Sequence, residues 1–246
     1  MPGFNSGPDP NFPYLGEFDC FSFPEPAKWK DDVIAIGGNL SPGMLLSAYS
    51  QGIFPWYNEG EPVVWQSPDP RLVIFPENLH VSSSMRKILK RRQFDITFNK
   101  DFEGVIRNCA QTERPGQGGT WITGDIIQAY MELHKLGWAF SAEAWHGGNL
   151  AGGCYGIMAG RVFFGESMFA KQPNASKAAF IELAARLFDE GTAFIDCQIP
   201  TRHLESLGGT RLNRKDFLRL LKNCLPIFKK NIKWENINPG TFFEPV

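Results

Sequence analysis

Motifs that bind nucleotides or metals are absent from this chain. No GxxxxGK[ST] loop is present and no GxGxxG run follows an expected strand, so nothing predicts a phosphate cradle. The four histidines form no HExxH or other metal-ligand spacing, and we expect neither a metal site nor a cofactor. No serine or cysteine stands in a GxSxG-like nucleophile motif. These absences argue against a catalytic triad and a metal hydrolase.

Long apolar runs are also absent. No stretch approaches the ~20 residues that span a bilayer, so we expect no membrane segment. The N-terminal residues have neither a basic region nor an apolar core and do not resemble a signal peptide. The five cysteines form no CxxC pair, which favours reduced thiols in the cytoplasm. The formal net charge of −1 leaves RNA binding open, because basic residues can still cluster.

Residues 1–72 are expected to form a small N-terminal domain. Its first 27 residues are rich in Pro, Phe and Gly, which suits an extended arm. A capped amphipathic helix is predicted between Ser41 and Gly52. The Pro-rich segments 52–56 and 65–71 are expected not to be central strands, because proline cannot donate to the hydrogen-bond ladder.

Residues 73–246 alternate between helical and strand patterns. Trp138 to Trp145 and Asn149 to Ile157 predict a hairpin, and Arg161 to Phe164 a third strand. This β-meander, with a helix and another strand behind it, predicts an α+β acyltransferase-like domain. Helices are expected at 82–91, 102–109, 123–137, 174–190 and from 213, with strands at 94–98 and 193–198.

Three polar residues within apolar runs are candidates for chemistry. Glu166 interrupts Phe163–Phe169, and a carboxylate there is costly unless it is paired or used. Asp196 and Gln198 stand at i and i+2 of a strand and should share a face. An alternative interpretation is that Asp196 is a buried cap for a neighbouring loop.

The helix that starts at Asn174 also has a simple interpretation. Most of its apolar residues, Phe180, Leu183, Ala184 and Leu187, are expected to be core.

A basic run and several loop tryptophans allow two interpretations each. The basic residues concentrate on one short helix, which is either a solvated face or a contact for an RNA backbone. Trp56, Trp65 and Trp121 lie in loops, where they either plug the core or stack on bases. The basic residues are Arg86, Lys87, Lys90, Arg91 and Arg92.

Eight segments, in order along residues 23–222, together resemble the leucyl/phenylalanyl-tRNA–protein transferase family. Each is weak alone, but eight in order are highly specific. They are Ala35-Ile-Gly-Gly38, Gly52-Ile-Phe-Pro-Trp56, Ser67-Pro-Asp-Pro-Arg71, Gly119-Thr-Trp-Ile122, Gly165-Glu-Ser-Met-Phe169, Asn174-Ala-Ser-Lys177, Ile195-Asp-Cys-Gln198 and Ser206-Leu-Gly208.

The resemblance implies a monomeric bacterial cytoplasmic enzyme of the N-degron pathway. It would transfer Leu or Phe, and less readily Met, from aminoacyl-tRNA to proteins whose N-terminal residue is Arg or Lys. The larger domain is expected to resemble the GNAT acyltransferase fold, with tRNA as the acyl donor in place of coenzyme A. An aminoacyl ester is already activated, so the reaction needs no ATP, and positioning can supply ~7–11 kcal/mol.

The resemblance also implies roles for individual residues. Asp196 would orient or deprotonate the attacking α-amine, and Gln198 would fix that carboxylate or the ester. Glu166 would hold the ester end or the positive charge of the acceptor. Trp56 and Trp121 match the positions that sandwich the terminal adenosine.

Two further surfaces follow from the same resemblance. The basic helix 86–92 would hold the acceptor stem of tRNA by its phosphates, without reading sequence. The donor side chain needs an apolar pocket, in which a flexible methionine would accommodate both Leu and Phe. Candidates for that pocket are Met168, Phe180, Leu183, Leu187, Ile195 and Cys154.

The chain departs from the family pattern at four positions, and two other functions are alternatives. The chain has Gln66, Phe140, Ala170 and Lys171 where relatives commonly have other residues, which bears on donor preference and acceptor affinity. An acetyl-coenzyme A N-acyltransferase would need a [QR]xxGx[GA] loop, but the glycines of the nearest run, 114–119, are out of register. A non-catalytic tRNA-binding protein is the other alternative.

Overall fold

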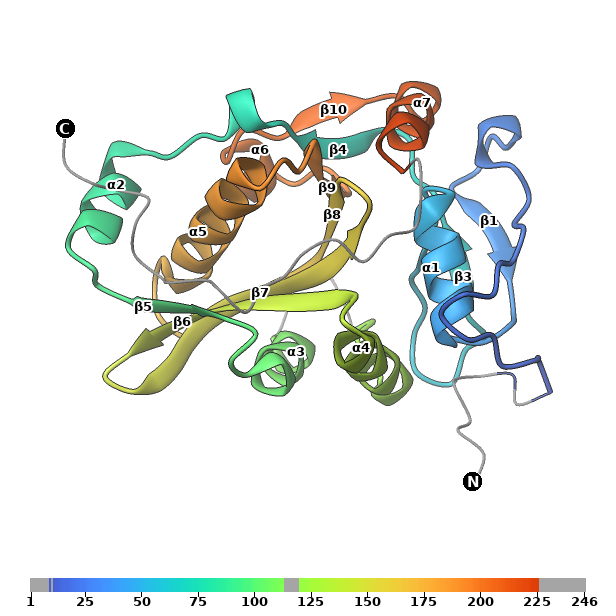
Figure 1. The fold of residues 1–246 in the computed structure, drawn as a ribbon, viewed down its shortest axis with the longest axis horizontal. Coiled ribbons are helices and arrows are strands. Elements are labelled where there is room, and N and C mark those ends of the chain that lie inside the picture. The colour runs from blue at the N-terminus through green and yellow to red at the C-terminus, as the bar shows by residue number, and fades with distance from the viewer. Residues whose placement is uncertain (1–8, 10, 113–119, 226–246) are drawn as a thin grey trace.

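The computed structural model describes residue 9, residues 11–112 and residues 120–225, and it is a mixed α/β fold with two sheets (Figure 1). The predicted combination of helices and sheet is confirmed. Seven strands form the larger sheet in the order β10-β4-β9-β8-β7-β6-β5, and three form the smaller one in the order β1-β3-β2. Within these residues no helix is long and apolar enough to cross a membrane. The run 114–119 and the segment 226–246 lie outside them.

The smaller sheet and helix α1 belong to the N-terminal part of the chain. Helix α1 (Pro42–Ser50) begins and ends as predicted, and Gly52 follows it with φ = 75°. Nearly every residue of α1 is buried, because the preceding chain wraps it and donates backbone N–H groups to Ser41 and Ser47. The other elements are the 3-10 turn η1 (Pro26–Lys28), β1 (Val33–Ile36), β2 (Phe54–Pro55) and β3 (Val64–Gln66).

The prediction that the Pro-rich segments contain no central strand is wrong in part. Trp65 and Gln66 end β3, the middle strand of the smaller sheet, and Arg71 begins β4 inside the larger one. Pro68 and Pro70 lie between these two strands, so their missing N–H groups affect only the connection.

Two helical layers cover opposite faces of the larger sheet (Figure 1). Helix α5 (Ala175–Asp189) packs on one face with Phe180, Leu183, Ala184 and Leu187 in the core, as predicted. Helices α3 (Phe102–Gln111) and α4 (Gly124–Leu136) cover the other face. The strands are β4 (Arg71–Ile74), β5 (Asp95–Phe98), β6 (Ala139–His146), β7 (Asn149–Ala159), β8 (Val162–Ala170), β9 (Phe194–Gln198) and β10 (Thr210–Leu212).

Helix starts follow the predicted capping residues with two exceptions, and the first is Ser41, whose side chain makes no cap bond at the start of α1. The hydroxyls of Ser82 and Thr123 and the side chain of Asn213 accept N–H groups at the starts of α2 (Ser83–Lys90), α4 and α7 (Arg214–Cys224). Asn174 precedes α5, but it has φ = 71° and its side chain makes no cap bond. The remaining elements are η2 (Pro76–Asn78) and α6 (Arg202–Glu205).

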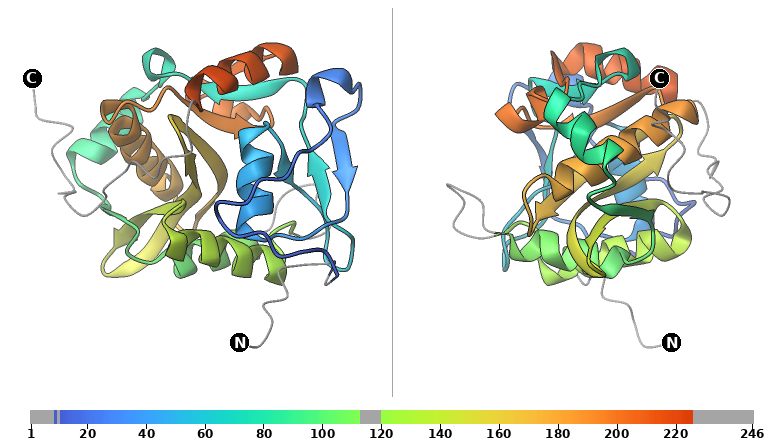
Figure 2. Two further views of the ribbon diagram at one scale, coloured as in Figure 1. Left: turned by 45° about the vertical axis from the view of Figure 1, so that its right-hand side comes forward. Right: turned by 90° about the vertical axis from the view of Figure 1, so that its left-hand side faces the viewer.

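Helix α7, the last one within the described residues, lies beside the N-terminal part of the chain (Figure 2). Buried Arg214 donates to the backbone oxygens of Pro26 and Trp29 and pairs with Asp32 at 2.9 Å. The predicted domain boundary at residue 72 falls within β4, which pairs with both β9 and β10.

Strand β8 contains a β-bulge, and the extra residue is Glu166. Tyr155 pairs with Ser167 while Gly156 pairs with Gly165, so Glu166 has no partner on β7. In an unbroken strand, residues an odd number apart point to opposite faces. Phe164 and Phe169 nevertheless belong to the same core cluster, because the bulge shifts the alternation by one residue.

Close contact across this bulge requires Gly156. A Cβ atom at Gly156 would lie 2.2 Å from the carbonyl oxygen of Phe164, whereas one at Gly165 would meet nothing closer than 3.6 Å. We therefore expect Gly156→Ala to lower the free energy of unfolding by about 1–3 kcal/mol or more. Urea unfolding measures this, with Gly165→Ala as the matched control. Equal losses in the two variants would contradict the bulge as the cause.

Candidate active site

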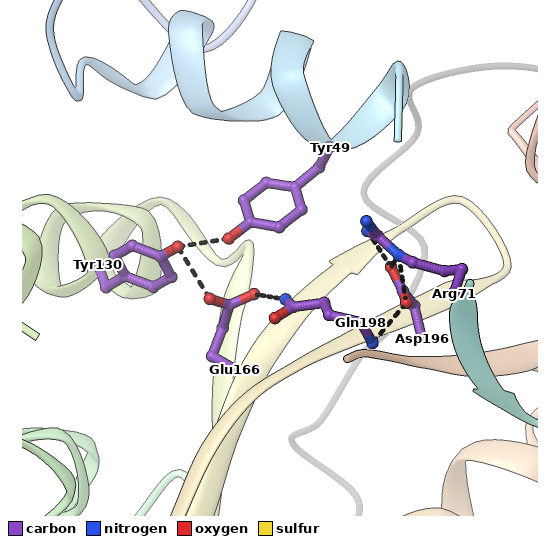
Figure 3. Close-up of polar contacts among 6 residues, drawn as sticks. All are labelled: Tyr49, Arg71, Tyr130, Glu166, Asp196 and Gln198. Carbon is purple, nitrogen blue, oxygen red and sulfur yellow. Dashed lines mark hydrogen bonds and ion pairs between the residues drawn. The ribbon is translucent and has the colours of Figure 1, made fainter. Parts of the chain in front are cut away.

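Glu166 is a buried carboxylate that accepts hydrogen bonds from neighbouring side chains. Tyr130 Oη donates to Oε2 at 3.0 Å and Gln198 Nε2 donates to Oε1 at 2.9 Å (Figure 3). Tyr49, from α1, shares a hydrogen bond with Tyr130. The site therefore joins a residue of the N-terminal part to residues of α4, β8 and β9.

Burial raises the pKa of Glu166 to about 7. The hydrogen bonds from tyrosine hydroxyls and from Gln198 act in the opposite direction, and the nearby charge of Asp196 adds to the rise. Near neutral pH, Glu166 is thus poised between its charged and neutral forms.

Asp196 is fully buried and held in a forked ion pair. Arg71 Nε lies 2.9 Å from Oδ1 and Nη2 lies 2.6 Å from Oδ2 (Figure 3). The backbone N–H of Gln198 also donates to Oδ1 at 2.8 Å. Both side chains of the predicted pair, Asp196 and Gln198, lie on the sheet face away from α5, but they reach different partners.

Strands β8 and β9 separate before they reach Glu166 and Gln198. Their parallel pairing ends at Phe164 opposite Asp196, while β8 continues to Ala170. A cavity of about 340 Å³ opens at the separation, a size ordinary for small-molecule sites. Glu166 and Gln198 line it, but Asp196 and Arg71 do not.

The predicted donor pocket is brought together in part. Met168, Phe180 and Cys154 line the cavity, together with Phe163, which the sequence pattern did not single out. Leu183, Leu187 and Ile195 do not reach it, because they are fully buried in the core between α5 and the sheet.

Two of the three loop tryptophans lie at the cavity. Trp56 is half-buried and Trp121 is 8% exposed, and both are lining residues. Trp65 is instead a core residue whose Nε1 donates to the Gly37 oxygen at 2.8 Å. Gln66, one of the departures from the family pattern, donates to the backbone oxygen of Trp56 at 3.4 Å.

Neither cysteine in the cavity wall is suited to act as a nucleophile. Burial raises the pKa of the Cys154 and Cys197 thiols, so both stay protonated. His203 also lines the cavity, and burial with the nearby Lys177 lowers its pKa. Among the described residues, no group of three or more His, Cys, Asp or Glu side chains could hold a metal ion.

The basic helix α2 is separate from the cavity. Three of the five predicted basic residues lie in α2, whereas Arg91 and Arg92 directly follow it, because the helix ends at Lys90. All five are exposed, and within the described part of the chain none of them forms an ion pair. Arg86 donates to the backbone oxygen of Val81 at 3.1 Å. The five residues are Arg86, Lys87, Lys90, Arg91 and Arg92.

Three residues of this network were not predicted from the sequence. Periodicity places Tyr49 and Tyr130 on apolar helix faces, although a buried tyrosine hydroxyl needs a polar partner. Arg71 ends a motif of the resemblance, but the motif alone gives it no role. An arginine at the start of an apolar strand segment was the available signal.

A cavity lined by a titratable carboxylate and a carboxamide that bond to each other defines a candidate enzyme active site. A family model for the leucyl/phenylalanyl-tRNA protein transferase matches residues 73–222, and a model for the N-terminal domain of that family matches residues 38–69. The chain belongs to this family and is an enzyme of the transferase class.

Two relatives bear the name of this family, and a solved structure is similar over part of the chain. A leucyl/phenylalanyl-tRNA–protein transferase of Flavobacterium johnsoniae is 52% identical over 205 residues, covering 83% of this chain and 97% of the relative. One of Christiangramia forsetii is 53% identical over 194 residues, covering 78% and 92%. A solved structure of a conserved Staphylococcus epidermidis protein of unknown function is 13% identical, with a TM-score of 0.41 and coverage of 58% and 57%.

Protonation of Glu166 should be visible in stability. The folded protein holds this proton up to about pH 7 and a free glutamate only to 4.5, so the contribution to stability is complete below 4.5 and is lost as pH rises through 7. Glu166→Gln removes the titration. As the pH rises from 4.5 to 7, the parent should lose stability that the variant keeps. The difference in the free energy of unfolding should therefore change in favour of the variant by on the order of a few kcal/mol. Urea unfolding at several pH values measures the difference, and a constant difference would contradict the expectation.

Proposed function

We propose that the enzyme transfers Leu or Phe, and less readily Met, from aminoacyl-tRNA to proteins with an N-terminal Arg or Lys, without ATP. The observation that carries the proposal is the cavity at the separation of β8 and β9. It combines an apolar wall, two tryptophans and the bonded pair Glu166 and Gln198. A hydrophobic aminoacyl ester and a basic acceptor match these three features.

The reaction is aminolysis of an ester. The α-amine of the acceptor attacks the ester carbonyl, the C–N bond forms, and the bond to the ribose oxygen breaks as that oxygen takes a proton. Glu166 would receive the proton of the amine, since its pKa of about 7 lies near that of an α-amine. Gln198 would orient Glu166 or the ester, and Asp196, with no cavity surface, would act through Gln198.

The donor would occupy the cavity in two parts. Met168, Phe180 and Cys154 would receive the apolar side chain, and the flexible methionine would adapt to either Leu or Phe. Trp56 and Trp121 would stack on the terminal adenosine, which their position in the cavity wall supports.

The exposed basic helix α2 would hold the acceptor stem of the tRNA by its phosphates. Its support is the exposure of all five basic side chains and their lack of acidic partners among the described residues. A solvated face is the alternative, and salt dependence distinguishes the two.

Further parts of the proposal concern architecture and setting. We assign residues 1–72 to a small N-terminal domain and residues 73–246 to a GNAT-like acyltransferase domain, which the separating parallel strands β8 and β9 support. The enzyme would act as a cytoplasmic monomer that needs no cofactor and marks its acceptors for N-degron degradation.

Transfer of radiolabelled Leu from charged tRNA tests the proposal. We expect label on a peptide that begins with Arg or Lys, in the absence of ATP, and little on one that begins with Asp, because the Glu166 carboxyl in the cavity wall would attract a basic acceptor and repel an acidic one. Labelled acetyl-coenzyme A should give no product. Equal labelling of the Asp peptide would contradict the acceptor assignment, acetyl transfer would favour a coenzyme A enzyme, and tRNA binding without turnover a non-catalytic protein.

Replacing Lys90 and Arg91 with Ala should weaken binding of charged tRNA and flatten its salt dependence. The slope should fall by about 0.7–0.9 for each phosphate that the helix no longer neutralises. Turnover with an aminoacyl-adenosine donor should stay the same, since that donor has no acceptor stem. Lys215→Ala with Lys222→Ala, two exposed lysines on α7, is the charge-matched control. Identical salt slopes for both variants and the parent would leave α2 as a solvated face.

A further inference from the structure

The ion pair behind the cavity has a geometry that a simple charge pair does not need. Arg71 presents two N–H groups to the two oxygens of Asp196, at 2.9 and 2.6 Å, and both side chains are fully buried. A planar guanidinium fixes the plane of a carboxylate in this arrangement, which an ammonium group cannot do.

The fixed carboxylate in turn holds an unusual backbone. Gln198 has φ = 62°, a region that residues other than glycine seldom adopt. Its N–H donates to Asp196 Oδ1 at 2.8 Å, and this bond supports the turn. The turn directs the Gln198 carboxamide toward Glu166, where Nε2 lies 2.9 Å from Oε1 (Figure 3).

Stability alone does not account for the arginine. The guanidinium lies over the rings of Phe54 and Phe217, at 4.9 and 4.5 Å from their centres, which holds its position. Its remaining nitrogen, Nη1, is buried and has no hydrogen-bond partner among the residues that the structure describes. A buried donor without a partner destabilises a folded protein, so the forked bond to Asp196 is the feature that this arginine supplies.

We propose that Arg71 is a positioning residue of the active site, which acts through Asp196 to hold the Gln198 carboxamide against Glu166. Its effect on rate rests on the proposed function, whereas its effect on the Glu166 carboxyl does not. The competing interpretation is a structural ion pair that only ties β4 to β9.

Arg71→Lys tests the proposal, because it keeps the charge and removes the fork. We expect single-turnover transfer to fall roughly 10- to 100-fold, as for a small misplacement at a reacting centre, with unchanged affinity for charged tRNA. Arg214→Lys is the matched control, since Arg214 is also buried and ion-paired but lies outside the cavity wall. It should lose thermal stability and keep the parent rate.

A second measurement follows the Glu166 carboxyl by ¹³C NMR in the unliganded protein. Its bond from Gln198 favours the charged form, so removal of that bond should move the titration midpoint to higher pH. The other groups that face Glu166 are the hydroxyls of Tyr49 and Tyr130 and the charge of Asp196, and Tyr155 lies beside them. The substitution Arg71→Lys does not remove any of these groups. This readout does not depend on which reaction the site performs, so it separates failure of the proposal from failure of the proposed function.

Phe217→Leu provides a second variant should Arg71→Lys not fold. It leaves the ion pair but removes one ring from the guanidinium, and Phe217 lies outside the cavity wall. We expect a smaller shift of the Glu166 midpoint in the same direction. A midpoint equal to that of the parent in both variants, or a rate loss in Arg71→Lys no larger than in Arg214→Lys, would overturn the proposal.

Discussion

A carboxylate removed from water must be given hydrogen-bond donors, and the site contains two such groups. Glu166 and Asp196 are both buried. In an apolar interior a neutral polar group without a partner costs ~2–7 kcal/mol, and an isolated charge also destabilises the fold by several kcal/mol. Their donors come from separate elements: Tyr130 from α4, Arg71 from β4, and Gln198 from β9, with Tyr49 of α1 behind Tyr130. Satisfying these two charges therefore joins distant parts of the chain.

The two carboxylates are satisfied to different degrees, and this difference separates their roles. Asp196 receives two N–H groups from Arg71 and one from Gln198, and it has no surface in the cavity. Glu166 receives neutral donors, keeps a face on the cavity, and has a pKa raised to about 7. A group that gains and loses a proton near neutral pH is suited to proton transfer, whereas a group fixed by a guanidinium is suited to holding geometry.

Much of the fold was predictable because its signals are local. Proline and serine at the start of α1, Thr123 and Gly137 around α4, and the β6–β7 turn follow from neighbouring residues. The bulge at Glu166 was not, because it depends on how β7 and β8 align. Likewise, periodicity placed Leu183 and Leu187 on the buried face of α5. It could not show which residues of that face line the cavity where β8 and β9 separate.

The same non-local geometry explains why the candidate catalytic pair was found but its hydrogen-bond partners were not. Alternation on a strand put Asp196 and Gln198 on one face, and they do share it. Alternation does not show that Gln198 ends the strand with a left-handed backbone, or that Arg71, 125 residues earlier, occupies the space in front of Asp196. An ion pair across that sequence distance forms only when β4 inserts between β10 and β9. The arrangement of the active site is thus completed by assembly of the sheet. Strand β4, which follows the Pro-rich connection, is therefore as much a part of the site as the residues that line its cavity.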